Sequence, residues 1–227
     1  MLLNDAKKLI DSLTGKKFGT FLTQEQMEDI KRNKGKSGQL LEITLGLNLS
    51  NASLDFEDGE LKTNKCNSCG KPLETMFITQ ISQMIDELLS ESDFYQSKLY
   101  KKIENLLYVP IDKESSNPSE WRYLDCTHVN LNEQKFYDIK KQLEEDYYSI
   151  CKQLNEHIQT STDNFIHTSN GKYIQIRSKD SKPYHPIYSN LYNKEVSNKN
   201  HAFYFKKAFM EDIVKINSTK KLLLGKR

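Results

Sequence analysis

The amino-acid sequence predicts an α/β or α+β fold, and the order of its hydrophobic patterns carries that prediction. Helical patterns open the chain, short strand-like runs follow, and one long helical pattern precedes two further strand-like runs. The chain has 227 residues, of which 37% are hydrophobic and 28% charged. These values suit a chain that buries one or two cores.

The N-terminal half alternates between helical and extended patterns. Thr23 is a suitable N-cap for the second helix, and Ser37 is expected to cap the third, where Glu42 is the only charged residue of an apolar stretch. Helices are expected at 3–12, 23–33, 38–47, 80–90 and 93–103. Strands are expected at 53–56, 60–64, 75–81 and 105–111, the last as a buried strand.

The C-terminal half contains the longest regular pattern, at residues 132–159. Its apolar residues recur at helical spacing, which predicts one buried stripe: Phe136, Ile139, Leu143, Tyr147, Ile150, Leu154 and Ile158. Strands at 172–177 and 202–207 and a helix at 210–216 are expected after it. Polar segments at 112–130 and 178–200 are expected to be irregular.

Charge and composition limit the possible partners and compartments. The net charge is only +2, but Lys31 to Lys36 form the basic run "KRNKGK", and the C-terminal end is also basic. Such patches suit a surface that meets phosphate on one side, although a solvated surface is the simpler explanation. No apolar run has the length of a membrane span, and the N-terminus lacks the pattern of a signal peptide, so we expect a cytoplasmic protein with no membrane partner.

The stretch "SLDFEDGELKTNKC" concentrates the residues that suggest chemistry. Glu60 and Lys62 lie two apart on an expected strand and therefore point to one side, with Leu61 towards the core. A hairpin turn at Asp58-Gly59 is expected to bring Asp55 beside Glu60. Two neighbouring carboxylates suit a hard cation such as Mg²⁺, for which Mn²⁺ can substitute, and the lysine could orient an attacking water.

Two alternatives stand beside this interpretation of the acidic stretch. The first is a solvated surface turn, because this spacing of charged residues arises by chance. The second concerns Glu42. It could be a third acid that faces the same metal, or it could instead form an ion pair with a nearby lysine. The residues alone leave both alternatives open.

Six segments of the chain resemble the MutH family of PD-(D/E)XK nucleases in order and spacing. They are "KRNKGKSGQLLEITLG", "GELKT", "GKPLETMF", "NLLYVPI", "GKYIQIR" and "FYFKKAF", and the resemblance runs from about residue 3 to about residue 214. The family includes a mismatch-repair nicking enzyme and restriction enzymes that cut at GATC. The resemblance implies a restriction-endonuclease-like mixed central sheet flanked by helices, with two lobes around a DNA cleft. We expect one unit over 1–227, with a catalytic lobe at about 1–111 and a DNA-reading lobe at about 112–227.

The resemblance assigns roles to individual residues. It matches Asp55, Glu60, Lys62, Glu42 and Lys102 to the catalytic set, with the three acids as metal ligands and a one-residue ambiguity between Lys102 and Lys101. It also implies a set of DNA-contacting residues, in which an arginine suits guanine and an aromatic ring can sense adenine methylation. These residues are Arg177, Tyr204, Phe77, Lys206, Lys207, Lys34 and Lys36.

Three departures from the family pattern affect the expected role. The spacing from Asp55 to Glu60 is two residues shorter, Ser178 replaces a proline of the nickase, and the loop at 178–200 shows little similarity. We therefore expect a Mg²⁺-dependent, sequence-specific endonuclease for double-stranded DNA, with type II restriction as the leading role. The alternatives are a mismatch-repair nickase at hemimethylated GATC, with a MutL-type partner, and a non-catalytic DNA-binding module. A monomer or weak dimer is expected.

The cysteines suggest a separate, weaker possibility. Cys66 and Cys69 form a Cys-x2-Cys pair, and with Cys126 and His128 they could bind structural zinc. A zinc-stabilised interaction protein is thus a third functional class. The alternative is free thiols, since the 4 cysteines of the chain do not make a disulfide framework.

Overall fold

The computed structural model describes residues 1–33, 35–47, 54–179 and 182–224. The chain divides into two units, each assembled from separate segments. Residues 1–74, 104–130 and 213–227 form the first unit, and residues 75–103 and 131–212 form the second. The catalytic lobe expected at about 1–111 and the DNA-reading lobe expected at about 112–227 are functional assignments, and they stay predictions.

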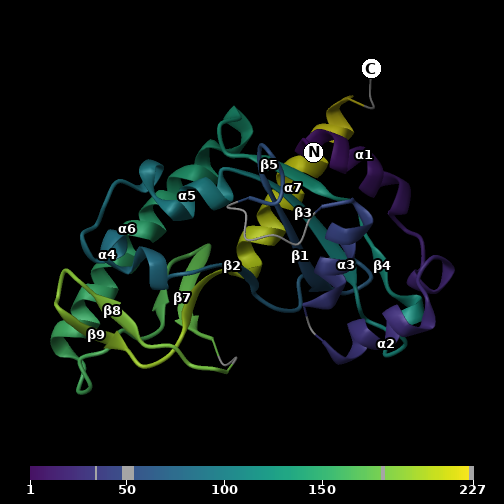
Figure 1. Ribbon diagram of the computed structural model, residues 1–227. Helices are drawn as coiled ribbons and strands as arrows, with labels where there is room; N and C mark the ends of the chain where they lie inside the picture. Colours follow the sequence, from purple (N-terminus) through teal and green to yellow (C-terminus); the bar gives the residue numbers. More distant parts are fainter. Residues whose placement is uncertain (34, 48–53, 180–181, 225–227) are drawn as a thin grey trace. The chain divides into compact units, whose positions relative to one another are not determined.

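The first unit is built on a mixed sheet with helices beside it (Figure 1). Its strands run in the order β1-β3-β4, and β5 pairs with β3; β1 and β3 are parallel and the other pairs antiparallel. The strands are β1 Glu60–Cys66, β3 Asn105–Asp112, β4 Arg122–Tyr123 and β5 Thr127–Asn130. The helices are α1 Leu3–Leu13, α2 Gln24–Arg32 and α3 Lys36–Thr44, with short 3-10 turns η1 Phe18–Thr20 and η4 Pro118–Glu120.

Alternation along β1 and β3 sends one face of this sheet into the core of the first unit. Leu61, Leu107 and Val109 are buried in one cluster with Leu3 and Ile10 of α1. Burial of this apolar surface stabilises the unit and favours one register of β1, since a slip of one residue would turn Leu61 away from the cluster. The opposite face of β1 therefore carries Glu60 and Lys62.

The second unit contains an antiparallel sheet, a separate hairpin and the longest helix. The sheet order is β2 Met76–Gln80, β10 His201–Phe205, β7 Ile174–Ser178 and β6 Ser169–Asn170, and the hairpin joins β8 Ile187–Ser189 to β9 Lys194–Ser197. Its helices are α4 Ile85–Leu89, α5 Lys98–Ile103 and α6 Tyr137–Thr160, with 3-10 turns η2 Ser82–Met84, η3 Phe94–Gln96 and η5 Gln134–Phe136. Helix α7, Lys207–Leu224, begins in this unit, and its residues from Ile213 belong to the first.

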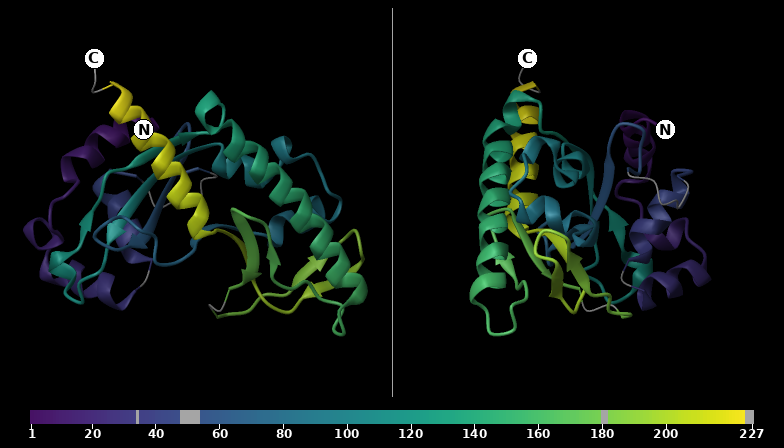
Figure 2. Two further views of the ribbon diagram at one scale, coloured as in Figure 1. Left: turned by 180° about the vertical axis from the view of Figure 1, so that it is seen from behind. Right: turned by 60° about the vertical axis from the view of Figure 1, so that its left-hand side comes forward.

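Helix α6 packs against the sheet of the second unit, next to β6 and β7 (Figure 2). Its predicted apolar stripe is buried, as expected. Asp146 interrupts the stripe although it is only 3% exposed. Its carboxylate accepts hydrogen bonds from the backbone N–H groups of Lys172, Tyr173 and Ile174 at 2.6 to 3.1 Å. A Cβ at Gly171 would approach this carboxylate to 2.3 Å, so the close contact that starts β7 requires glycine.

The structure confirms some local predictions and corrects others. Thr23 caps α2 through a capping box with Gln26, as expected. Ser37 does not cap α3; Gly35 is the N-cap, and the buried Ser37 hydroxyl accepts a hydrogen bond from Lys113 Nζ at 2.7 Å.

The predicted strand at 53–56 is wrong for residues 54–56, which lie in a bend, while Ser53 lies outside the described residues. The segments expected to be irregular carry β4, β5, β8 and β9. These short strands are stabilised by pairing with distant residues, which local patterns do not reveal.

The fold class is nevertheless the predicted one, a mixed α+β arrangement consistent with a restriction-endonuclease-like fold. Among the described helices, none combines the length and the apolar character that crossing a membrane requires.

Candidate active site and DNA-reading surface

The segment from Asp55 to Glu60 is a tight turn before β1 and not a strand of a hairpin. The backbone N–H of Phe56 donates to the carbonyl of Gly59 at 2.9 Å, and the N–H of Leu61 donates to Asp55 Oδ2 at 2.9 Å. The Asp55 carboxylate is thereby fixed at the start of β1. A Cβ at Gly59 would come within 2.5 Å of the Asn105 carbonyl oxygen, so this turn lies directly against β3.

Glu60 and Lys62 point to the same side of β1, as predicted from their spacing. Lys62 Nζ lies 2.6 Å from Glu60 Oε1, and the side chains are only 13% and 3% exposed. An ion pair so shielded from water is sensitive to any further charge placed beside it.

Glu42 on α3 belongs to the same electrostatic cluster. Burial raises the pKa of its carboxyl above the usual range, the negative charges of Asp55 and Glu60 raise it further, and Lys62 opposes them. The third acid expected from the sequence is therefore near enough for the charges of the other two to act on it. The structure thus brings Asp55, Glu60, Lys62 and Glu42 together, within reach of one another's charge.

The composition of this cluster fits a divalent cation. Three carboxylates supply the oxygen ligands that Mg²⁺ prefers, and their mutual repulsion, visible in the raised pKa of Glu42, is what a bound cation would offset. As they are placed within the described ranges, however, no three His, Cys, Asp or Glu side chains lie close enough together to hold a metal ion, so the fit rests on the chemistry of the three carboxylates.

Lys102 comes from a different part of the chain. It lies with Lys101 in the last turn of α5, which belongs to the second unit, whereas the acidic cluster belongs to the first. Its assignment to catalysis stays a prediction.

Arg177, Tyr204 and Phe77 form a contact cluster on neighbouring strands of the second unit. The guanidinium of Arg177 lies 4.2 Å from the centroid of the Tyr204 ring, and Tyr204 meets Phe77 edge-on with centroids 5.7 Å apart. Lys179 Nζ lies over the Phe77 ring at 5.1 Å, a neighbour that the sequence did not single out. Arg177 and Phe77 are exposed, so the cluster presents a cation and an aromatic ring to a ligand.

The predicted phosphate-contacting lysines differ in their surroundings. Lys206 Nζ donates to the Gly171 carbonyl at 2.9 Å and is partly buried, whereas Lys207 is exposed at the start of α7. Lys36 lies 3.5 Å from Asp29. Lys34 falls outside the described residues.

The four zinc candidates have separate surroundings. Cys66 is buried and lies opposite Asp112, Cys69 is exposed, Cys126 Sγ donates to Asp11, and His128 Nε2 lies 2.7 Å from Asn105 Oδ1. Burial raises the pKa of the Cys66 thiol to about 12, which disfavours the thiolate that zinc requires. The structure does not bring these residues together as a site.

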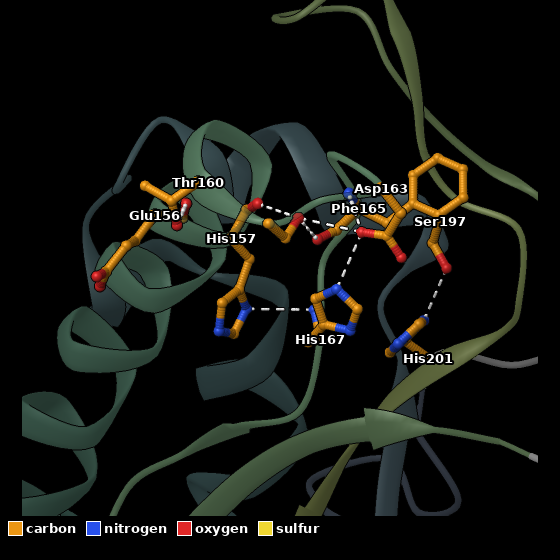
Figure 3. Close-up of polar contacts among 9 residues, drawn as sticks. Glu156, His157, Thr160, Asp163, Phe165, His167, Ser197 and His201 are labelled. Atoms are coloured by element: carbon orange, nitrogen blue, oxygen red, sulfur yellow. Dashed lines mark hydrogen bonds and ion pairs between the residues drawn. The ribbon is translucent and has the colours of Figure 1, made fainter.

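Histidines without an assigned role form contacts near the end of α6, as Figure 3 shows. The backbone N–H of His167 donates to His157 Nδ1 at 3.2 Å, and the ring Nε2 of His167 lies 3.0 Å from Asp163 Oδ1. His201, at the start of β10, lies 3.1 Å from the Ser197 hydroxyl. The contacts of His157 and His167 hold the loop that follows α6, and the contact of His201 joins the end of β9 to the start of β10.

The sequence is similar to known proteins over its central part. Residues 47–145 match the family model described as "DNA mismatch repair enzyme MutH". A DNA mismatch repair protein MutH from Shigella flexneri serotype 5b (strain 8401) is 32% identical over 156 residues, which cover 67% of this chain and 63% of that protein. The protein of the same name from Escherichia coli O6:K15:H31 (strain 536 / UPEC) is 32% identical over 158 residues. The chain thus spans less than two thirds of the length of these relatives.

Proposed function

Because this chain belongs to the MutH family of nucleases, we propose that it is a divalent-metal-dependent DNA endonuclease that nicks DNA in mismatch repair. The observation that carries the proposal is the cluster in which Glu60, Lys62 and the raised-pKa carboxyl of Glu42 adjoin Asp55. The same residues would be difficult to explain as a solvated turn, since Glu60 and Lys62 are largely buried.

Each residue of the cluster has a task in hydrolysis of a phosphodiester bond. Asp55, Glu60 and Glu42 would hold Mg²⁺ or Mn²⁺, which when bound supplies Lewis acidity and a more acidic water. Lys62, adjacent to Glu60, positions the attacking water through its ammonium group. Lys102 is the proposed contact to the negative charge that develops on the phosphate.

The relatives favour repair over the leading expectation of type II restriction. The matched family and the curated relatives are named as mismatch repair proteins, so the expected alternative, a nickase at hemimethylated GATC, is better supported. In this role a MutL-type protein is the proposed partner, and double-stranded DNA is the substrate.

Variants of β1 test the active-site assignment. Glu60→Ala and Lys62→Ala should abolish nicking of plasmid DNA in Mg²⁺ but leave binding of DNA in Ca²⁺ largely intact, because neither residue is proposed to contact bases. Lys65→Ala, at an exposed position of the same strand, should nick normally. Full activity of either active-site variant would exclude the assignment.

Methylation of the target separates the two biological roles. A repair nickase should cut one strand of hemimethylated GATC and spare the fully methylated duplex, whereas a restriction enzyme should cut both strands of the unmethylated site. Tyr204→Ala should alter the response to methylation, because the buried Tyr204 ring supports the exposed Arg177 and Phe77 side chains that are proposed to meet the bases. If no form of GATC is cut, the proposed target is wrong.

A binding module that does not cleave DNA is the competing proposal. It predicts that the parent protein cleaves no DNA in Mg²⁺ or Mn²⁺ and that the Glu60→Ala variant still binds DNA. The nicking assay on the parent protein therefore decides between the two.

A further inference from the structure

A buried polar atom beside the proposed active site has no partner. Among the described residues, the Oδ1 atom of Asn64 is buried without a hydrogen bond, and the whole residue is only 5% exposed. A buried carbonyl oxygen without a partner is costly, so such an atom in a folded protein calls for a physical reason.

The orientation of the Asn64 amide follows from its other contact. Asn64 Nδ2 donates to the Glu74 carbonyl at 3.2 Å. If the amide were flipped, two oxygens would face each other there, so the atom without a partner is the acceptor and not the donor. Asn64 therefore offers a lone pair to a donor that comes from elsewhere.

Lys62 is placed to be that donor. Residues 60, 62 and 64 alternate along β1 and project to the same face, with Lys62 between Glu60 and Asn64. In the structure the Lys62 ammonium contacts Glu60 Oε1, at 2.6 Å and 13% exposure. A cation bound by Glu60 would compete for that same carboxylate, and an ammonium group so shielded from water needs another acceptor.

We propose that Asn64 is a positioning residue whose Oδ1 atom accepts a hydrogen bond from Lys62 when a divalent cation occupies Glu60. The inference rests on the proposed function, since it requires a cation at the acidic cluster. Asn64 thereby lowers the free energy needed to separate the Lys62 ammonium from Glu60. It also keeps that ammonium beside the site of hydrolysis.

Tyr108 provides a matched control from the same sheet. Its hydroxyl is also buried without a partner in the described structure, and it lies opposite Lys62 in the ladder between β1 and β3. Burial raises the pKa of Tyr108, and the neighbouring Cys66 raises it further.

The experiment measures the binding of Ca²⁺ to the full chain by isothermal titration calorimetry with a GATC duplex present, a readout that involves no cleavage. Asn64→Leu keeps the side-chain volume but removes the acceptor, and it should raise the half-maximal Ca²⁺ concentration about tenfold, the effect of one hydrogen bond to a charged group. Asn64→Leu in a Lys62→Met background should change nothing further, because the ammonium group is absent. Tyr108→Phe should behave as the parent.

Three outcomes would overturn the proposal. The first is a half-maximal Ca²⁺ concentration that is the same in Asn64→Leu as in the parent. The second is a change in that concentration by Asn64→Leu that is equally large with and without Lys62. The third is an equal effect of Tyr108→Phe, which would mean general damage to the sheet. If the parent protein neither binds Ca²⁺ nor nicks DNA in Mg²⁺, the proposed function fails as well. If the parent protein nicks DNA but the effect of Asn64→Leu does not depend on Lys62, only this inference is overturned.

Discussion

The guanidinium of Arg177 lies over the ring of Tyr204, 4.2 Å from its centroid, although 26 positions separate them in the sequence. The contact arises because β7 and β10 pair antiparallel, with Ala202 opposite Arg177 and Tyr204 opposite Gln175. This cation–π contact restricts the position of the guanidinium before any ligand arrives. A restricted planar group loses less entropy on binding a base edge than a free side chain does.

Arg177 is therefore expected to contribute to recognition of guanine. Arg177→Ala should weaken binding to the GATC site by about 1–3 kcal/mol and affect other sequences much less. Arg177→Lys should not restore recognition, because an ammonium group lacks the planar fork. Competition binding with matched and altered duplexes measures the difference, and equal losses on all sequences would assign Arg177 to the phosphate backbone.

Lys206 and Lys207 are adjacent, yet the structure predicts different effects for their replacement. Lys207→Met should reduce the slope of the salt dependence of DNA binding by about one unit, because an exposed lysine can contact a phosphate. Lys206→Met should leave the slope unchanged and lower the stability by about 1–2 kcal/mol, because its ammonium is hydrogen-bonded to Gly171. Salt titrations and urea denaturation of both variants test this, and the reverse pattern would show that Lys206 reaches DNA.

Gly59 is expected to be intolerant of any side chain. Gly59→Ala should destabilise the protein by about 1–3 kcal/mol, since its Cβ would lie 2.5 Å from the Asn105 carbonyl oxygen. Gly35→Ala is the control, because a Cβ there has open space around it. Urea denaturation compares the two, and an undisturbed Gly59→Ala protein would contradict the close contact between the turn and β3.

Acid is expected to destabilise the histidine contacts at the end of α6. Burial lowers the pKa of His157 below its ordinary 6.5, the charge of His167 lowers it further, and Glu156 opposes both. The folded state then binds fewer protons than the unfolded state as the pH falls below 6.5, so stability present above that pH is lost towards the lower, folded-state pKa.

The variant His157→Gln tests this expectation, because glutamine keeps an acceptor for the N–H of His167 but does not titrate. Its free energy of unfolding, measured by urea denaturation from pH 7 to about pH 5, should fall less steeply than that of the parent. His185→Gln, at an exposed position, controls for the loss of a histidine as such. Identical pH dependence in His157→Gln and the parent would contradict the assigned cause.

Local patterns in the sequence determined much of the fold. The apolar stripe of α6 follows from helical spacing, because one face of the helix must leave water. The buried strand β3 follows from a continuous apolar run, since both of its faces are buried. The capping box at Thr23 and the common direction of Glu60 and Lys62 are likewise local, since they depend on residues two or three apart.

Only the tertiary structure decided how distant segments combine. The parallel pairing of β1 with β3 replaced the expected hairpin, and it explains why Asp55 is held by the N–H of Leu61 in a turn and not on a paired strand. The approach of Glu42 to the other acids, the capture of Lys206 by Gly171 and the separate surroundings of the four zinc candidates also depend on packing between elements. The sequence names the residue types that can perform the chemistry. Their distances, burial and charge environment arise from contacts between residues far apart in the chain, which no local pattern encodes.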